Sequence, residues 1–326
     1  FDSRFLQRGM LTYESLRRHS TRNLVLWILC LDDTVFEFLE KAKMRGIRPI
    51  PMSALENADR ELAATRKTRT DAEYYFTCTP CFPKFILDQD ERIPDITYID
   101  ADLYFFSDPE QIFSDIGDNS IAITPHRFSK KNKEREKWGI YNVAFNFFRR
   151  DQHGLECLHW WRERCIEWCY DRLEDGKFAD QKYLDDWPAR FGGVKVLDSP
   201  GVNFAPWNVE DSELKCRSGK VLVDGAPLVF YHFHAFKQCG PNLFNPSFDN
   251  YDILPSYTLR FKIYQPYSNH YKKLKTKHSE LCRINAINRQ LAINEDANHL
   301  RSLGDVFITE PKNAGRLMRR AKETTV

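Results

Sequence analysis

The feature that most constrains the fold is a continuous apolar run of strand length, Leu24–Leu31 (LVLWILCL). Because the run has no polar face, both sides of the resulting strand must be covered, as in the sheets of α/β proteins. An amphipathic helix is predicted before it, over Arg4–His19. A second helix is predicted after it, from a cap at 32–34 to about Met44.

The rest of the chain continues this alternation of strands and helices. Strands are predicted at 47–50, 96–99, 120–124, 143–148, 194–197 and 228–232, and helices at 71–87, 155–170 and 178–187. The pattern indicates an α/β protein with a mixed, mostly parallel sheet covered by helices. The chain has no glycine-rich dinucleotide loop and no P-loop, so those ligand classes gain no support.

Composition narrows the class further. The 326 residues carry a net charge of +2, which is too small to predict a nucleic-acid partner. No apolar run reaches the length of a transmembrane helix, and the first residues do not form a secretory signal. Nine scattered cysteines, an odd number, favour a reducing cytoplasm. Cys78 and Cys81 form a C-x-x-C pair, which we interpret as core thiols because no second pair lies at zinc spacing.

One short motif carries most of the functional information: Tyr98-Ile99-Asp100-Ala101-Asp102. A strand projects alternate side chains to one face, so Asp100 and Asp102 can point the same way. Two carboxylates at the end of a strand form a hard-oxygen site suited to Mg²⁺ or Mn²⁺. The alternative is a surface turn in which one acid caps the next helix.

Further segments supply polar groups of the kind a metal and sugar site needs: Asn142, Asp180-Gln181, His232-Phe233-His234 followed by Lys237, and Arg69. Each has a plain structural alternative. Asp180 could cap a helix, either histidine could be a hydrogen-bonded core residue, and Lys237 could lie on the surface. Together they could provide a third metal ligand and groups that grip sugar hydroxyls.

In this order, the motifs resemble those of GT-A-fold glycosyltransferases over roughly residues 1–240. The likeness is to the retaining group that includes glycogenin and bacterial lipooligosaccharide galactosyltransferases, and to bacterial proteins described only as nucleotide-diphospho-sugar transferases. Two departures occur at the His-Phe motif: Ala235 replaces the family's glycine, and the lysine comes one residue early. The family's first strand is also absent ahead of the segment Phe1–Leu6.

The resemblance implies a role for each matched residue. It implies that Asp100, Asp102 and His232 hold Mn²⁺ or Mg²⁺, with His234 as a rival ligand. It implies donor contacts from Asp2, Arg69, Asp100, Ala101, Asn142 and Asp180. It implies catalytic roles for Asp180, Gln181 and Lys237. Trp207 is the expected acceptor contact.

The implied reaction is metal-dependent transfer of a sugar from a nucleoside diphosphate, expected to be UDP, to a glycan or lipid-linked acceptor with retention. Two alternatives remain open: a sugar nucleotidyltransferase, and a non-catalytic binding protein on a degenerate transferase fold. A nucleotidyltransferase would need a glycine-rich phosphate loop near the start of the chain, and none is present.

The sequence divides into a GT-A-like catalytic domain at 1–250, without its first strand, and a basic helical extension at 251–326. The extension carries 14 Lys and Arg residues against 7 Asp and Glu. It is interpreted either as a solvated helical tail or as a surface for anionic lipid or an anionic acceptor. The expected location is the cytoplasm, with peripheral contact to the inner face of the membrane.

Overall fold

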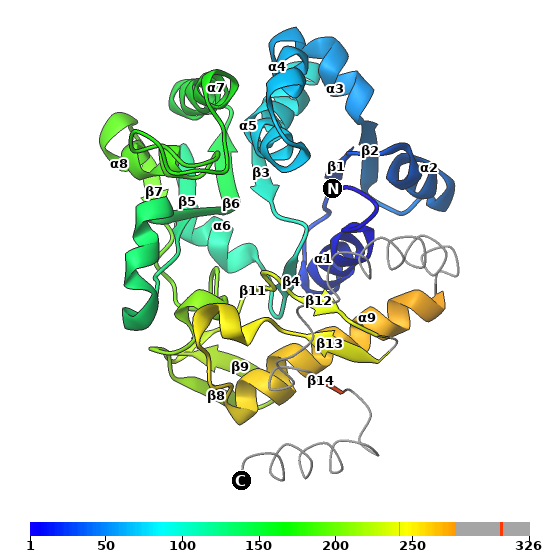
Figure 1. Ribbon diagram of the computed structural model, residues 1–326, viewed down its shortest axis with the longest axis vertical. Coiled ribbons are helices and arrows are strands. Elements are labelled where there is room, and N and C mark those ends of the chain that lie inside the picture. The colour runs from blue at the N-terminus through cyan, green and yellow to red at the C-terminus, as the bar shows by residue number, and fades with distance from the viewer. Residues whose placement is uncertain (241, 278–306, 309–326) are drawn as a thin grey trace.

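A computed structural model describes residues 1–240, 242–277 and 307–308 (Figure 1). It confirms the α/β class, with helices covering a mixed sheet. The helices are α1 Leu6–His19, α2 Asp33–Ala42, α3 Met52–Ala58, α4 Arg60–Thr65, α5 Asp71–Gln89, α6 Glu110–Ile116, α7 Gln152–Glu167, α8 Trp187–Arg190 and α9 Gln265–Lys277. The strands are β1 Leu26–Cys30, β2 Ile47–Pro51, β3 Asp95–Ile99, β4 Leu103–Phe105, β5 Ile121–Pro125, β6 Tyr141–Arg149, β7 Val194–Val196, β8 Leu214–Arg217, β9 Lys220–Val223, β10 Ala226–Pro227, β11 Phe230–His232, β12 Lys237–Gln238, β13 Leu243–Asn245 and β14 Phe307–Ile308.

The main sheet has the strand order β3-β6-β5-β7. β6 runs antiparallel to both of its neighbours, and β7 runs parallel to β5. β1 and β2 form a separate parallel pair, and β4 pairs antiparallel with β11. The sheet is mixed, as predicted. Two of the three strand pairs in this sheet are nevertheless antiparallel, because β6 lies antiparallel between β3 and β5.

Local signals explain where the predicted helices begin. Asp32 caps α2 by accepting a hydrogen bond from the Val35 N–H at 2.9 Å. Thr70 and Glu73 form a capping box that starts α5. α5 then runs to Gln89 through two prolines, and the prediction of a helix there is confirmed.

The prediction of a helix over 178–187 is wrong. Ala179 has φ +45°, a left-handed conformation that a right-handed helix cannot contain. The chain instead turns at Asp180, and a short 3₁₀ helix follows at Lys182–Asp186 before α8. This turn matters for the site because it directs the Asp180 side chain inward.

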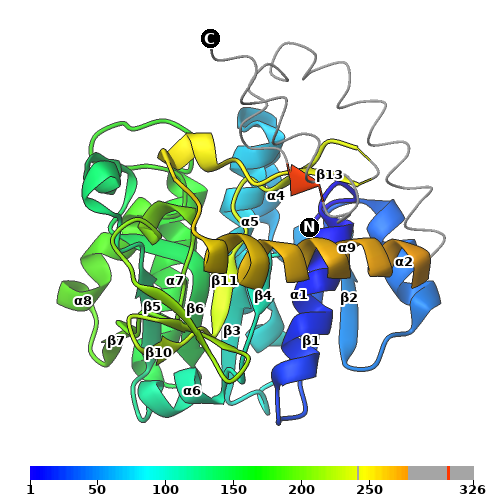
Figure 2. The same ribbon diagram turned by 90° about the horizontal axis from the view of Figure 1, so that it is seen from below.

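α9 crosses α1 and shares a hydrophobic core with it (Figure 2). Tyr267 and Leu274 of α9 belong to the same buried cluster as Leu6 and Met10 of α1. Residues 251–277 therefore pack with the N-terminal helix, so the core continues past residue 250. The second basic group of the predicted extension, at 316–322, lies outside the described residues.

The structure also bears on membrane-spanning helices and on the Cys78–Cys81 pair. Within the described ranges, no helix is both long enough and apolar enough to cross a bilayer. Cys78 and Cys81 are buried free thiols in α5, which agrees with their interpretation as core residues.

Candidate active site

A cavity of about 1010 Å³ opens beside the Asp-Ala-Asp motif. Its lining combines polar side chains with aromatic and aliphatic side chains of α5, β1 and β3. The lining includes the predicted residues Asp100, Ala101, Asp102, Asn142, Asp180, Gln181 and His232. The fold therefore gathers side chains that are up to 132 positions apart in the sequence.

Backbone hydrogen bonds fix the Asp-Ala-Asp turn. The Asp100 N–H donates to the Ala144 carbonyl of β6 at 3.1 Å. The Thr12 hydroxyl of α1 hydrogen-bonds to the Ala101 carbonyl at 2.8 Å. Pairing of β4 with β11 then sets Leu103 opposite His232 and brings the imidazole next to the carboxylates.

Asp100, Asp102 and His232 form a compact group of ligand atoms. One such atom from each residue lies within 4.8 Å of the other two, so the group could hold a metal ion. His232 Nε2 is 3.0 Å from Asp102 Oδ1 and 4.0 Å from Asp100 Oδ2. The Tyr98 hydroxyl donates to Asp100 Oδ1 at 2.9 Å. Two carboxylates and one imidazole suit a divalent ion such as Mn²⁺ or Mg²⁺.

The charges of this group are incompletely balanced. Burial raises the pKa of Asp100, and the Asp102 charge adds to that effect. Burial also opposes ionisation of Asp102, but His232 outweighs it and keeps the Asp102 pKa well below its usual value. The described ion-pair contacts of both carboxylates go to the same imidazole. A protonated His232 can compensate only one negative charge, so the site attracts a further cation.

Asp180 and Gln181 enter the cavity from the turn after α7. The Asp180 carbonyl accepts a hydrogen bond from the Trp161 indole N–H at 2.8 Å, which fixes the backbone. Its side chain is buried, and burial together with the Asp100 charge raises the Asp180 pKa to about 7. Gln181 donates to the Trp138 carbonyl at 3.2 Å. Gly139 permits this approach, because a Cβ there would lie 3.0 Å from the Gln181 side chain.

Asn142 is held by a histidine that our sequence analysis missed. Burial lowers the pKa of His126 to about 3, so its ring is neutral. Nδ1 donates to the Ile140 carbonyl at 3.3 Å, and Nε2 accepts from the Asn142 amide at 3.1 Å. The Asn142 amide also lies 3.5 Å from Gln181 Oε1. His126 lies two positions after the predicted strand at 120–124. Its place at the end of a strand could have marked it as a candidate site residue.

Two aromatic residues at the cavity wall were also missed. Trp138 and Phe178 are half-buried and pack with their ring centroids 6.2 Å apart. Both line the cavity beside Asp180 and Gln181. Exposed aromatic faces next to polar groups are suited to stack on sugar rings.

Trp207, the predicted acceptor contact, lines the cavity but is only 2% exposed. Its ring meets the His232 ring edge-on at 5.0 Å and the His234 ring at 5.7 Å. Trp207 therefore packs against both imidazole rings and helps to fix their positions. His234 lines the cavity without joining the three-residue ligand group, which favours His232 as the third ligand.

Asp2 lines the cavity, whereas Arg69 and Lys237 do not. The Asp2 carboxylate accepts hydrogen bonds from the Arg4 and Phe5 N–H groups just before α1, and from Arg4 Nε at 2.7 Å. Arg69 donates to the Cys165 and Ile166 carbonyls at the end of α7. Lys237 is exposed on β12. The structure thus does not bring the predicted basic catalytic and donor residues to the metal ligands.

Comparison with solved structures finds glycosyltransferases. Mouse xyloside xylosyltransferase 1 in its apo form has a TM-score of 0.42 and 14% identity, covering 71% of this chain and 93% of its own. A glycosyltransferase involved in glycosylation of the major capsid of PBCV-1 has a TM-score of 0.36 and 13% identity, covering 65% and 94%. The WbbM bifunctional glycosyltransferase has a TM-score of 0.40 and 13% identity, covering 64% and 40%. These distant likenesses assign no activity to this chain.

Sequence comparison gives nearer relatives. No protein-family model matches the chain. The uncharacterized protein YfnD of Bacillus subtilis (strain 168) is 31% identical over 245 residues, which cover 74% of this chain and 78% of YfnD. The uncharacterized protein YfnF of the same strain is 36% identical over 220 residues, which cover 65% of this chain and 72% of YfnF. The chain therefore belongs to the family of YfnF and YfnD.

Proposed function

We propose that this protein is a metal-dependent glycosyltransferase that moves a sugar from a nucleoside diphosphate to a hydroxyl group of a glycan or lipid-linked acceptor. The observation that carries the proposal is the meeting of Asp100, Asp102 and His232 in one cavity with Asp180 and Gln181. A divalent ion held by the first three would neutralise charge on the departing diphosphate. The other two would contact the sugar.

The residues around the sugar subsite have separable tasks. Gln181 is oriented by Asn142 and by the Trp138 carbonyl, so its amide is positioned before a substrate arrives. Asp180 can accept a hydrogen bond from a sugar hydroxyl when ionised. The Trp138 and Phe178 rings would stack on a sugar at the cavity wall.

UDP as the nucleotide, retention of configuration and Mn²⁺ or Mg²⁺ as the ion are parts of the proposal supported by the motif resemblance. No side chain in the described site is placed as an obvious nucleophile for a covalent sugar intermediate. The expected path is therefore attack by the acceptor hydroxyl on the same face from which the diphosphate leaves.

The C-terminal basic residues would contact an anionic acceptor or an anionic lipid surface. The described part of this segment provides Lys272 and Lys273 on α9. Two neighbouring lysines are already engaged: Lys277 pairs with Glu14 at 2.8 Å, and Lys275 hydrogen-bonds to the Gln238 side chain. Lys272 and Lys273 are therefore the lysines to test for lipid binding.

A nucleotide-sugar panel tests the proposal directly. The purified protein is incubated with each donor and Mn²⁺ or Mg²⁺, and release of the nucleoside diphosphate is measured. We expect slow hydrolysis of at least one donor, abolished by a chelator and restored by the metal. If UDP and the other nucleoside diphosphates bind equally well with and without metal, and no donor is hydrolysed, the proposal fails.

A further inference from the structure

A cation that has no task so far lines the cavity. Arg135 belongs to the 3₁₀ helix Lys130–Trp138, and its side chain is half-buried. Its Nε donates to the Asn132 side-chain oxygen at 3.0 Å, and its Nη2 donates to the Asn250 carbonyl at 2.7 Å. Both acceptors are neutral, so these bonds orient the guanidinium without compensating its charge.

Two lysines of the same segment differ from Arg135 in this respect. Lys131 pairs with Asp252 at 3.2 Å, and Lys133 pairs with Glu136 at 2.6 Å. Among residues 1–240, 242–277 and 307–308, Arg135 forms no ion pair with a carboxylate, and its Nη1 makes no hydrogen bond. A guanidinium presents its donors in a fixed fork that matches the oxygen atoms of a carboxylate or phosphate. Arg135 therefore has an unused donor for an anionic group.

Aromatic contacts connect Arg135 with the side of the cavity that holds the metal ligands. Its guanidinium carbon lies 4.8 Å from the centroid of the Tyr251 ring. The Tyr251 and His234 rings pack with their centroids 6.0 Å apart, and the His234 and His232 rings follow at 5.8 Å. Arg135 is thus separated from the third metal ligand by two rings that also line the cavity.

The second aromatic neighbour of Arg135 belongs to the proposed sugar subsite. The guanidinium carbon lies 5.7 Å from the centroid of the Trp138 ring, and the Trp138 carbonyl accepts from the Gln181 amide. Lys137 Nζ lies 4.5 Å from the same centroid, and Lys137 has no carboxylate partner in the described part of the chain. A sugar in contact with Trp138 would therefore meet two cations whose charges no carboxylate compensates.

The distribution of charge in the cavity separates acidic from neutral sugars. A neutral sugar is bound by hydroxyl hydrogen bonds and aromatic contacts, and it has no use for a guanidinium. The carboxylates of Asp100 and Asp180 repel an acidic group, whereas Arg135 attracts it. Repulsion at one place and attraction at another fix the orientation in which an acidic sugar can enter.

We propose that the acceptor is an acidic sugar, whose carboxylate or phosphate group binds Arg135 while its ring contacts Trp138. Lys137 adds attraction for the same group. The inference rests on the proposed transferase function and names the class of its acceptor.

The test compares three small sugars as probes: methyl β-D-glucuronide, glucose 6-phosphate and methyl β-D-glucoside. Each is titrated into the full chain with UDP and Mn²⁺ present, and its Kd is measured by saturation-transfer difference NMR. One of the two acidic probes should bind at least about 10-fold more tightly than the neutral glucoside, because it gains a charge-assisted hydrogen bond. The acidic probe that binds more tightly identifies the group as carboxylate or phosphate.

Three variants show whether Arg135 causes the preference. In Arg135→Gln the ratio of the two Kd values should fall below about 2-fold, and in Arg135→Lys it should be about 3-fold, because lysine keeps the charge but not the fork. Arg190→Gln is the control and should keep the parent ratio, because Arg190 lies over the Trp160 ring at 4.5 Å but does not line the cavity. A ratio measured within one protein does not depend on how much of that protein is folded, so a loss of stability cannot imitate the result.

Equal affinity for acidic and neutral probes in the parent, or an unchanged ratio in Arg135→Gln, would overturn the proposal. A loss of UDP affinity in Arg135→Gln as large as the loss for the acidic probe would assign Arg135 to the diphosphate and would also overturn it. Donor hydrolysis without any acidic preference would refute this inference alone. An Arg135-dependent preference without hydrolysis of any donor would support the acidic-sugar site and refute the transferase function.

Discussion

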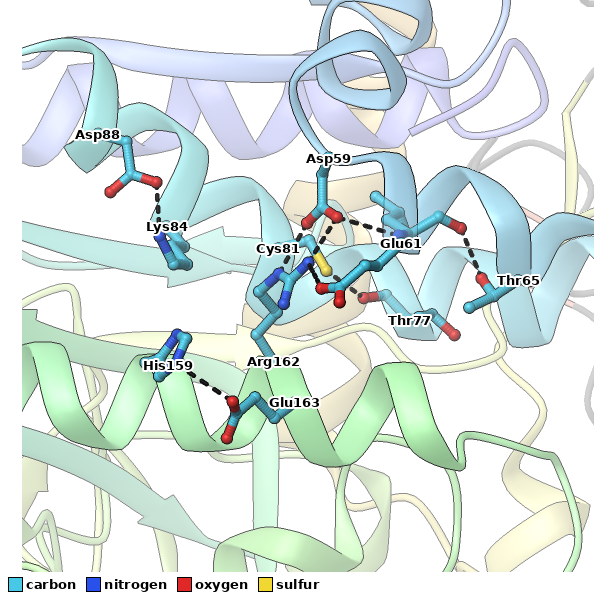
Figure 3. Close-up of polar contacts among 11 residues, drawn as sticks. Asp59, Glu61, Thr65, Thr77, Cys81, Lys84, Asp88, His159, Arg162 and Glu163 are labelled. Atoms are coloured by element: carbon cyan, nitrogen blue, oxygen red, sulfur yellow. Dashed lines mark hydrogen bonds and ion pairs between the residues drawn. The ribbon is translucent and has the colours of Figure 1, made fainter.

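Two clusters of charged residues in this molecule each join two carboxylates to one basic side chain, but they differ in how the second carboxylate is accommodated. Arg162 of α7 donates from Nε to Asp59 Oδ2 at 2.7 Å and from Nη2 to Glu61 Oε2 at 2.8 Å, joining α7 to α4 (Figure 3). Asp59 and Glu61 both contact this one guanidinium, but the Glu61 side chain is 71% exposed to solvent, so only Asp59 depends on Arg162 to compensate its charge. Asp100 and Asp102, by contrast, share the single imidazole of His232.

This difference distinguishes charged groups that stabilise the fold from charged groups that are available to bind a ligand. A bidentate, partly buried ion pair holds two helices together and has no unfilled position. A buried and a half-buried carboxylate that share one partner are costly unless something else binds them. We therefore expect changes to the Arg162 cluster to affect stability, and changes to the Asp100–Asp102 pair to affect metal binding and turnover.

The largest expected effect is on turnover. Asp102→Asn removes one ligand oxygen charge and the stronger partner of His232, so metal-dependent donor hydrolysis should fall by at least about 100-fold. The folded state should remain, because the backbone bonds of the turn do not use this side chain. Hydrolysis rates for the two proteins with saturating Mn²⁺ provide the check. Unchanged turnover would remove the metal site from the mechanism.

Stability should respond in opposite directions at the two clusters. Asp59→Asn leaves the Arg162 guanidinium without its main charged partner and should lower the free energy of unfolding by about 1–3 kcal/mol. Asp100→Asn relieves repulsion between a half-buried and a buried carboxylate, and the amide oxygen can still accept from Tyr98. Without metal, its free energy of unfolding should be unchanged or higher by up to about 1 kcal/mol.

Urea unfolding measures both variants, with Asp88→Asn as the matched control. Asp88 pairs with Lys84 at 2.6 Å but is exposed, so that substitution should change stability by less than about 0.5 kcal/mol. A loss at Asp100 as large as the loss at Asp59 would show that the cavity carboxylates are structural.

Glu14 is a second carboxylate with a structural role, and its contribution to the free energy of unfolding should depend on pH. It hydrogen-bonds to His270 at 2.7 Å and pairs with Lys277, and the His270 hydrogen bond is the main cause that lowers the Glu14 pKa from 4.5 to about 2. A lowered carboxylate pKa stabilises the fold above the unfolded value, and the contribution disappears as pH falls from 4.5 toward 2.

Glu14→Gln should therefore cost about 1–2 kcal/mol at pH 7, after allowance for partial exposure, and progressively less below pH 4.5. The measurement is the difference in unfolding free energy between the two proteins across pH 2.5–7. A pH-independent difference would mean that the carboxylate charge is not what stabilises the contact between α1 and α9.

The smallest effect concerns backbone strain near the site. Ala235 has φ +59°, a left-handed conformation in which glycine is favoured. Ala235→Gly should raise the free energy of unfolding by about 0.5 kcal/mol, since relief of strain is partly offset by greater freedom in the unfolded chain.

Lys43→Gly, at the left-handed C-cap of α2 with φ 42°, is the control and should give a similar gain. Mn²⁺ affinity should be the same in both variants. A destabilised Ala235→Gly protein would show that the Cβ at this position makes contacts that outweigh the strain.

The sequence was sufficient for features that depend on neighbouring residues. The apolar run at Leu24–Leu31 and the capping residues at Asp32 and Thr70 gave β1, α2 and α5 close to their observed limits. The Asp-x-Asp alternation gave the two carboxylates, and Tyr98 could have been added, because it lies two positions earlier on the same strand face.

Features set by distant contacts were not predictable. The turn at Asp180 depends on a left-handed Ala179, which apolar periodicity does not reveal. The His126 ring holds Asn142 only because β5 and β6 pair in one particular register. Arg69 looked like a phosphate ligand by its charge, yet it binds helix carbonyls that come from a segment 96 residues away.

The most direct test is titration of Mn²⁺ into the purified protein. The concentration of free Mn²⁺ is measured at each step by electron paramagnetic resonance. Asp102→Asn is measured beside the parent, with Asp59→Asn as a carboxylate-loss control away from the cavity. We predict one Mn²⁺ site in the parent and in Asp59→Asn, and affinity at least about 10-fold weaker in Asp102→Asn. Equal Mn²⁺ affinity in all three proteins would contradict the assignment of Asp100, Asp102 and His232 as the ligands.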